Sequence, residues 1–212
     1  MEAARRAPDA GAPTFDFDAV DFVTADHHFG HARIIEHARR PFDDVETMDA
    51  YLVERWNSIV PPGAVVLHLG DLLMASMNDL GDSLALTRQL HGRRLLVPGN
   101  HDWVSRATQT QKRIRSMVPL YEAAGWTVLP EVLSGSRRGH LLRASHYPYA
   151  TVALDKFRKL RPLDDNVRLL HGHTHSTSAF ISPETMMHVG VDAWNFYPVA
   201  MTAVDDWLAS RP

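Results

Sequence analysis

Short apolar runs recur along the chain and, in its first half, alternate with longer segments of helical periodicity. Each run is typical of a buried strand, and the clearest cover residues 22–25, 64–69 and 95–97. Between and after these runs, apolar residues recur every three to four positions, which predicts helices over 44–59, 78–90 and 105–124. Strands and helices therefore alternate through this half, as in α/β proteins.

The second half is dominated by short strand patterns joined by Gly, Ser or Pro turns. The predicted strands cover 126–129, 131–133, 140–144, 167–170, 187–189 and 198–203, before a closing helical turn at 205–209. Two mixed sheets packed face to face, with helices outside, would satisfy the whole pattern. We predict one α/β domain over 15–212, preceded by a loose tail over 1–14 that is rich in Ala, Pro and Gly.

Composition narrows the possible chemistry. The chain has 212 residues, of which 45% are hydrophobic and 22% charged, as in a globular domain. It has no cysteine, which excludes disulfides and thiolate metal sites and suits a cytoplasmic protein. No apolar run approaches the roughly 20 residues of a membrane span, so we expect no membrane association. Thirteen histidines without cysteine point to metal binding by nitrogen and oxygen ligands.

Five polar motifs follow predicted strands, where α/β folds place their chemistry. They are Asp26-His27-His28, Gly70-Asp71, Gly99-Asn100-His101-Asp102, Ser145-His146 and Gly172-His173-Thr174-His175. Together they offer the ligands that a dinuclear hydrolytic site needs, including a carboxylate that bridges two ions. We predict seven metal ligands: Asp26, His28, Asp71, Asn100, His146, His173 and His175.

Residue spacing suggests how these ligands are shared. Asp71 is the natural bridge, and Asp26 and His28, two apart on an extended segment, can converge on one ion. Two divalent ions bring four positive charges against two negative carboxylates, Asp26 and Asp71. The remaining positive charge would hold a phosphate ester. The ligand set suits two divalent transition-metal ions; we favour Mn, with Fe, Zn, Co or Ni compatible.

Three further residues are candidates for contacts with substrate. His101 follows the ligand Asn100, where a general acid near a leaving-group oxygen belongs, and Asp102 could orient its ring. We therefore predict His101 and Asp102 as catalytic, and Asn100, His101 and His31 as substrate-binding. For His31 a packing role at a helix start is an equal alternative.

The motif series resembles the calcineurin-like metallophosphoesterase family over about residues 22–203. The resemblance implies a four-layer α/β/β/α sandwich and a phosphoester hydrolase that acts through a metal-bridging hydroxide. It implies one ion held by Asp26, His28, Asp71 and His175. It implies a second ion held by Asp71, Asn100, His146 and His173, with His101 as acid or phosphate contact.

One departure from the family pattern bears on the substrate. Protein phosphatases of the family carry Asp-Arg shortly after Gly-Asp and Glu after Asn-His, whereas this chain has Leu72-Leu73-Met74 and Asp102. We therefore predict a phosphodiesterase acting on nucleotide or nucleic-acid phosphodiesters. The alternatives are a nucleotide phosphomonoesterase or pyrophosphohydrolase, or a non-catalytic metal-stabilised scaffold. The expected partner is a small phosphoester or a nucleic acid, with no obligate protein partner.

Several other features have competing interpretations. Residues 156–161 combine four cations with Phe157, which could bind a nucleic acid, although a solvated surface is the more common interpretation. Tyr147 and Tyr149 could stack on a base or simply pack a loop. Arg33, Arg39 and Arg40 could flank the cleft, although a solvated helix surface is the more common interpretation. The aromatic turn at 192–197 has no assigned role.

Overall fold

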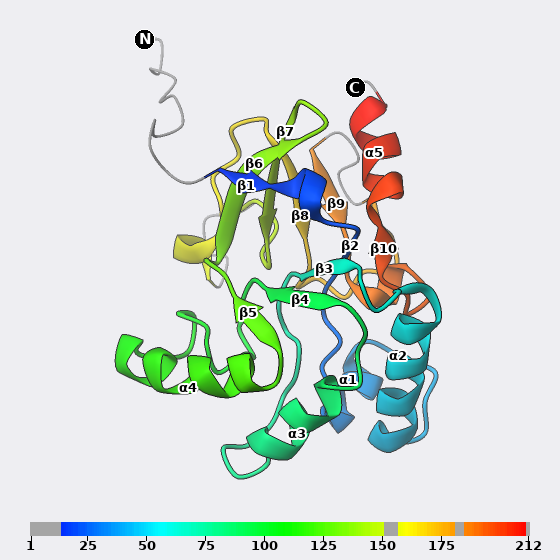
Figure 1. Ribbon diagram of the computed structural model, residues 1–212, viewed down its shortest axis with the longest axis vertical. Coiled ribbons are helices and arrows are strands. Elements are labelled where there is room, and N and C mark those ends of the chain that lie inside the picture. Colours follow the sequence, from blue (N-terminus) through cyan, green and yellow to red (C-terminus); the bar gives the residue numbers. More distant parts are fainter. Residues whose placement is uncertain (1–13, 151–156, 181–184, 211–212) are drawn as a thin grey trace.

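Two five-stranded sheets and five α-helices make up the computed structural model, which describes residues 14–150, 157–180 and 185–210 (Figure 1). The predicted tail lies, apart from Thr14, outside these described residues. Among the described residues, every helix is too short or too polar to cross a membrane.

The first sheet is mostly parallel and carries three of the predicted motifs. Its strands, in spatial order, are β10 (Val199–Ala200), β2 (Phe22–Thr24), β3 (Val65–His68), β4 (Arg93–Leu96) and β5 (Trp126–Val128). Strands β2 to β5 run parallel in register, with Val23 opposite Leu67 and Leu67 opposite Leu95. Parallel strands end at the same edge of a sheet, so the loops after β2, β3 and β4 meet there.

The second sheet is mixed and carries the other two motifs. Its order is β1 (Phe15–Asp16), β6 (Val132–Arg137), β7 (His140–Ser145), β8 (Arg168–His171) and β9 (Met186–His188). Strand β7 is antiparallel to β6 and parallel to β8, and β8 is parallel to β9. The loops after β7 and β8 therefore also share one edge.

Four helices lie on the outer side of the first sheet, below it in Figure 1. They are α1 (Ala32–His37), α2 (Val45–Ile59), α3 (Leu80–Thr87) and α4 (Gln111–Ala123). Helix α5 (Met201–Ala209) closes the chain and buries Trp207 and Leu208 in the core between the sheets. Short 3₁₀ turns are η1 (Phe17–Ala19), η2 (Arg158–Leu160) and η3 (Val191–Ala193).

Two hydrophobic clusters hold these layers together. One joins the first sheet to helices α2 to α4 and contains the fully buried rings of Trp56, Tyr121 and Trp126. The other fills the space between the sheets, with Leu67 and Leu142 among its members. Burial of each such large side chain contributes roughly 1.5–3 kcal/mol to folding. These layers confirm the predicted α/β sandwich of two mixed sheets.

Capping residues explain where the predicted helices begin. Asp44 accepts a hydrogen bond from the Thr47 amide at 2.7 Å, and α2 begins directly after it. Thr110 similarly caps α4 through the Arg113 amide, so this helix begins at Gln111 rather than at 105. The helix continues through Pro119, whose ring lies on the exposed side.

The prediction for the C-terminal strand was wrong in its extent. Strand β10 has two residues, and Met201 already begins helix α5. The apolar residues of this segment serve both elements, and a run of that kind does not distinguish a strand from a buried helix. Helix α1 and strand β1, with six and two residues, were not predicted at all.

Candidate metal centre

The loops that follow β2, β3, β4, β7 and β8 bring all the predicted ligands together. The sheets extend into these loops, because the Asp26 and His28 amides donate to the carbonyls of Gly70 and Asp71 at 3.0 Å. Three overlapping groups of ligand atoms result, each within 4.8 Å: Asp26, His28 and His175; His28, Asp71 and His101; Asp71, His146 and His173.

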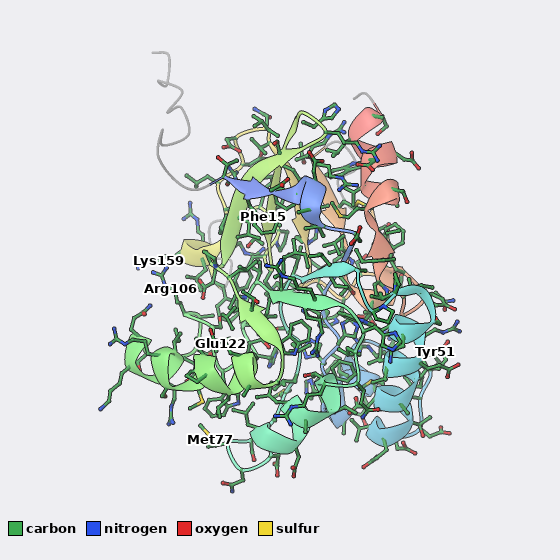
Figure 2. All side chains as sticks on the ribbon, viewed as in Figure 1. Phe15, Tyr51, Met77, Arg106, Glu122 and Lys159 are labelled. Atoms are coloured by element: carbon green, nitrogen blue, oxygen red, sulfur yellow. The ribbon has the colours of Figure 1, made fainter. Side chains whose placement is uncertain are left out.

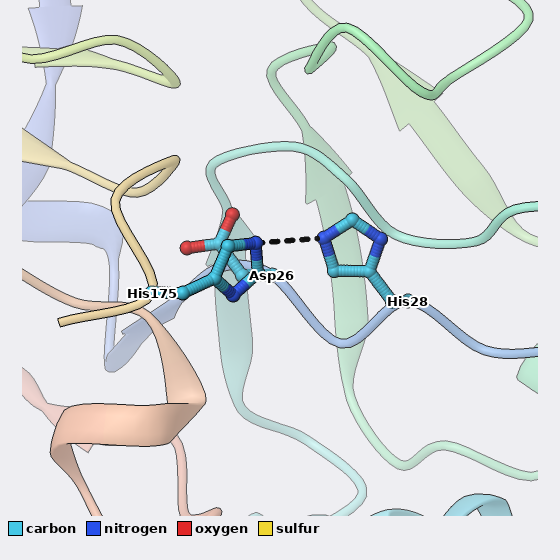
Figure 3. A group of neighbouring side chains, drawn as sticks. All are labelled: Asp26, His28 and His175. Atoms are coloured by element: carbon cyan, nitrogen blue, oxygen red, sulfur yellow. Dashed lines mark hydrogen bonds between the residues drawn. The ribbon is translucent and has the colours of Figure 1, made fainter. Parts of the chain in front are cut away.

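The first ligand set lies at the end of β2. Asp26 and His28 come from the loop after that strand, and His175 approaches from the loop after β8 (Figure 3). The Nε2 atoms of His28 and His175 are 3.2 Å apart. Residues two apart on the extended segment thus converge, as their spacing predicts.

The second ligand set lies beside it. The His146 Nε2 atom is 3.1 Å from His173 Nδ1 and 3.2 Å from the Asn100 side-chain oxygen. Asn100 follows β4, so this set joins both sheets.

Asp71 lies between the two sets. Its Oδ2 atom is 3.5 Å from His28 Nε2 and 3.4 Å from His146 Nε2. Metal–ligand bonds of about 2.0–2.2 Å place neighbouring ligands of one ion about 3–3.5 Å apart. The distances from His28 to His175 and from His146 to His173 and Asn100, all 3.1–3.2 Å, match that spacing. Asp71 is placed to bridge an ion in each set.

Hydrogen bonds on the far side of two rings decide which nitrogen faces the site. His146 Nδ1 lies 2.9 Å from the Leu69 carbonyl oxygen, and His175 Nδ1 lies 2.8 Å from Asp192 Oδ2. Since both partners only accept, each Nδ1 carries the proton and donates, which leaves the Nε2 lone pair for a metal. Both rings therefore turn Nε2 toward the site, which is the nitrogen that a metal would take.

Arg40 is buried against the loop after β2 and against Asp192, whereas a solvated helix surface was the more common interpretation of its sequence position. It is only 5% exposed. Its guanidinium donates to both carboxylate oxygens of Asp192 and to the carbonyls of Asp26 and His27. Asp192, in the turn without an assigned role, thereby connects His175 to the loop after β2.

A buried pair of histidines joins two of the loops. The His27 Nδ1 atom is 2.9 Å from His68 Nε2, and the Gly70 amide donates to His68 Nδ1 at 3.1 Å. His68 therefore carries its proton on Nε2 and donates to His27. This chain of contacts holds the Asp26–His28 loop against the Gly70–Asp71 loop.

The backbone is strained at most of the ligands. Asp26, His28, Asp71, His173 and His175 all have φ between +50° and +74°, which is uncommon for residues other than glycine. Such conformations cost of order 1–3 kcal/mol each and cluster at functional sites. These backbone conformations therefore lower the stability of the folded protein, and they set the directions in which the five side chains point.

At two positions the backbone passes so close to a carboxylate of the site that only glycine fits. A Cβ atom on Gly99 would lie 2.3 Å from Asp71 Oδ1, and one on Gly190 would lie 2.5 Å from Asp26 Oδ2. Neither position has room for a side chain, so both carboxylates depend on a bare backbone beside them.

His188 is a neighbour of the site that the sequence did not reveal. The side chain is fully buried in β9, and its Nε2 atom lies 3.6 Å from Asp26 Oδ2. Neither ring nitrogen has a hydrogen-bond partner within the described part of the chain. A buried polar ring without a partner is costly, and we infer that its contact with Asp26 compensates.

Replacing His188 with leucine should therefore weaken metal binding. Leucine keeps much of the volume but removes the polar contact that orients Asp26, and loss of such supporting contacts typically costs 10–100-fold in metal affinity. Isothermal titration with Mn²⁺ measures this, with His140→Leu, an exposed histidine at the β6–β7 turn, as the control. Equal affinities for the two variants would contradict the assigned role.

Burial sets the protonation of most ligand histidines. It lowers the pKa of His146 to about 4 and that of His173 to about 3, and it holds the pKa of His28 well below its usual value. These three rings are therefore neutral at pH 7 and able to bind a cation.

The carboxylates and His175 behave differently. Burial, with the nearby charges of Asp102 and Asp26, raises the pKa of Asp71 well above its ordinary value. Although burial raises the pKa of Asp26, contacts with His188, His175 and His146 hold it well below that value. Burial also opposes protonation of His175, but the hydrogen bond to Asp192 raises its pKa overall.

Metal binding should consequently release protons in mildly acidic solution. Protonated His175 and Asp71 must lose their protons before they bind an ion, so affinity should rise with pH through the raised pKa of His175. Asp192→Asn removes the charge that raises this pKa, and should reduce proton release at about pH 6. Titration calorimetry in buffers of different ionisation enthalpy counts the protons. Unchanged proton release in Asp192→Asn would refute this assignment.

Two of the predicted substrate-binding residues, His101 and His31, lie beside His28. The His101 side chain is 33% exposed, against 1% for His28, and its Nε2 atom is 4.0 Å from Asp71 Oδ2. His31, the N-terminal cap of α1, is partly buried; its ring centroid is 5.3 Å from that of His28 and 5.8 Å from that of His101.

The hydrogen bonds described for Asp102 support the backbone, whereas we predicted that it orients His101. Its carboxylate accepts from the amides of Asp71, Leu72 and Gly99 at 2.8–3.1 Å. The side chain is fully buried. Through these hydrogen bonds Asp102 holds the loop after β3 against the loop after β4.

No family model matches the chain. The Gene 66 protein of Mycobacterium phage L5 is 34% identical over 195 residues, which cover 82% of this chain and 86% of that protein.

One solved structure supports the fold. A protein of unknown function from Aquifex aeolicus, AQ665, has a TM-score of 0.63 at 21% identity, covering 87% of this chain and 97% of its own. A novel archaeal phosphodiesterase has a TM-score of 0.40 at 13% identity, covering 80% of this chain and 82% of its own. The second likeness is too weak to bear on activity.

Proposed function

Since this chain belongs to the family of the Gene 66 protein of Mycobacterium phage L5, whose name states no activity, we propose its function from its site. We propose a metal-dependent phosphoester hydrolase with a dinuclear centre. The observation that carries this proposal is the position of Asp71 Oδ2, 3.4–3.5 Å from a ring nitrogen of each ligand set.

The donor atoms fit two divalent transition-metal ions. Neutral imidazole nitrogens, carboxylate oxygens and an amide oxygen suit Mn, Fe and Zn, and the absence of cysteine disfavours softer thiolate-bound ions. One ion would be held by Asp26, His28, Asp71 and His175. The other would be held by Asp71, Asn100, His146 and His173. Of the compatible metals we favour Mn.

Ions bound there would neutralise a phosphate ester and lower the pKa of a coordinated water to about 7. The protein supplies orientation and a proton. The Asn100 side-chain oxygen lies 3.2 Å from His146 Nε2, and the His101 ring borders Asp71. The His101 backbone amide donates to Asp71 Oδ1 at 2.9 Å, which fixes the loop. The partly exposed His101 ring, when protonated, would give its proton to the leaving oxygen.

We propose phosphodiesters of nucleotide or nucleic-acid type as substrates, cleaved in the cytoplasm. The signature that the family resemblance associates with protein phosphatases is absent. Where it would stand, Leu72 and Leu73 are buried, and Leu73 pairs with Phe29 beside the site. The loop after β3 therefore presents no arginine for a phosphate monoester dianion.

Hydrolysis of bis-p-nitrophenyl phosphate beside p-nitrophenyl phosphate tests the proposal. Metal-stripped protein should be inactive, and Mn, Fe, Zn, Co or Mg added back should restore turnover, faster on the diester. Faster turnover of the monoester would favour a phosphomonoesterase or pyrophosphohydrolase. Stoichiometric metal binding without turnover of either compound would favour a non-catalytic scaffold. Asp26→Asn, which weakens one ligand set, serves as the negative control.

A further inference from the structure

An aromatic and basic segment, residues 157–161, lies next to the second ligand set. It comprises Phe157, the turn η2 and Arg161. Lys156, the first residue of the basic stretch noted in the sequence, lies outside the described residues. The proposed chemistry at the metal centre gives this segment no role.

Aromatic rings connect the segment to two metal ligands. The Tyr147 ring centroid lies 4.9 Å from that of His146 and 5.0 Å from that of His173. The Phe157 ring lies 5.4 Å from Tyr147 and 6.0 Å from His173. Tyr147 is 1% exposed, whereas Phe157 is only half-buried. Phe157 is therefore the ring that this aromatic wall presents to solvent beside the ligands.

Positively charged side chains lie beside the rings of Tyr147 and Phe157. The Arg161 guanidinium carbon lies 5.7 Å from the Tyr147 ring centroid, and its Nη1 donates to the Pro148 carbonyl at 3.1 Å. Burial and the His146 charge lower the pKa of His173, and the Arg161 charge adds to this effect, which places Arg161 within electrostatic reach of the ligands. Arg158 and Lys159 are exposed, and Figure 2 shows Lys159 at the periphery of the molecule.

Exposed charges of both signs lie in and after this segment. Asp164 and Asp165 are exposed in the loop that follows, and Asp165 is paired with Arg143 at 2.8 Å. Arg158 and Lys159 are the two exposed cations of the segment.

The backbone at Phe157 is unusual as well. Its φ is +65°, in the left-handed region that bulky residues seldom occupy. Strained positions of this kind concentrate at ligand-binding sites, and here the strained residue carries the half-buried ring beside His173.

We propose that residues 157–161 form a binding platform for single-stranded nucleic acid, with Phe157 stacking on a base beside the scissile phosphate. Arg158 and Lys159, the exposed cations of the segment, contact neighbouring phosphates. The platform rests on the proposed phosphodiesterase function and specifies its substrate. Stacking on aromatic rings combined with a basic groove is how proteins hold single strands without sequence preference. In a duplex the base faces are covered, so the ring could reach one only after unstacking.

Binding of phosphorothioate oligonucleotides to the metal-loaded full chain tests the platform, because this linkage keeps the charge while slowing cleavage. Fluorescence anisotropy compares a thymidine 12-mer with an abasic 12-mer of equal charge. The wild type should prefer the thymidine strand. Phe157→Ala should weaken thymidine binding by roughly 5- to 100-fold with little change for the abasic strand. Phe157→Trp should retain the preference.

A separate pair of substitutions tests how much positive charge contributes to strand binding. Arg158→Gln with Lys159→Gln should weaken both strands and make binding less sensitive to salt, with a slope smaller by about 0.7 for each phosphate that the variant no longer neutralises. Arg138→Gln, an exposed arginine at the turn before β7 and hence at the far end of that strand from His146, should change neither strand.

The outcomes separate this inference from the proposed function. Equal wild-type affinity for both strands, or equal weakening of both by Phe157→Ala, would overturn the platform even if bis-p-nitrophenyl phosphate is hydrolysed. Tighter binding of a thymidine-containing duplex than of the single strand would overturn it too. A base preference that disappears in Phe157→Ala, with no hydrolysis of any phosphoester, would support the platform and refute the enzyme.

Discussion

Replacing Asp71 with alanine is expected to abolish binding of both ions and reduce hydrolysis to the background rate. Asp71 Oδ2 is the only carboxylate oxygen described within 3.5 Å of a ring nitrogen from each ligand set, so its removal takes a ligand from both. Elemental analysis after equilibration with Mn²⁺ should fall from two ions per chain toward none. Asp206→Ala, an exposed acid on α5, should retain both ions.

The stability of the same variant distinguishes a lost site from a lost fold. Burial and two neighbouring carboxylates raise the pKa of Asp71, so the ionised group destabilises the metal-free protein. Metal-free Asp71→Ala should therefore melt at or above the wild-type temperature, while the rise in melting temperature on adding Mn²⁺ disappears. Retention of two ions per chain would contradict the bridging assignment.

Replacing His101 with alanine is expected to slow cleavage of a diester with a poor leaving group by the roughly 10²–10⁴-fold typical of general acid catalysis. An alkoxide needs a proton to depart, whereas p-nitrophenolate does not. Bis-p-nitrophenyl phosphate should therefore be far less affected than a dinucleotide. The comparison of kcat for the two substrates measures the effect, with His140→Ala as the control.

Metal content decides how that result is interpreted. The ligand atoms of His28, Asp71 and His101 also lie within 4.8 Å of one another, so spacing alone would allow His101 to be a ligand. We expect His101→Ala to keep both ions. Loss of an ion, with equal slowing of both substrates, would place His101 among the ligands and leave the general acid to another group.

That the predicted ligands lie together could be inferred from the sequence, because each follows a strand whose apolar character is visible locally. Asp26, Asp71 and Asn100 follow parallel neighbours of one sheet, and chain order alone brings such strand ends together. The spacing within Asp26-His27-His28 likewise needs only local geometry. These inferences required no knowledge of distant contacts.

Supporting residues were missed because their roles depend on distant contacts. Arg40 and Asp192 lie 152 positions apart, and His188 reaches Asp26 from the other sheet. No periodicity links such residues. The backbone contacts of Asp102 were not foreseen either, since adjacency to His101 suggested a side-chain partner, whereas the hydrogen bonds described for its carboxylate come from the backbone of two loops. Helix α1, with six residues, is too short to show a hydrophobic period.

An anomalous difference map from crystals grown with Mn²⁺ tests the central claim most directly. We predict two peaks roughly 3.5–4 Å apart, one on either side of Asp71 Oδ2. One peak should contact Asp26, His28 and His175, and the other should contact Asn100, His146 and His173. A map without peaks at these residues, or with a single peak that does not touch Asp71, would contradict the dinuclear centre.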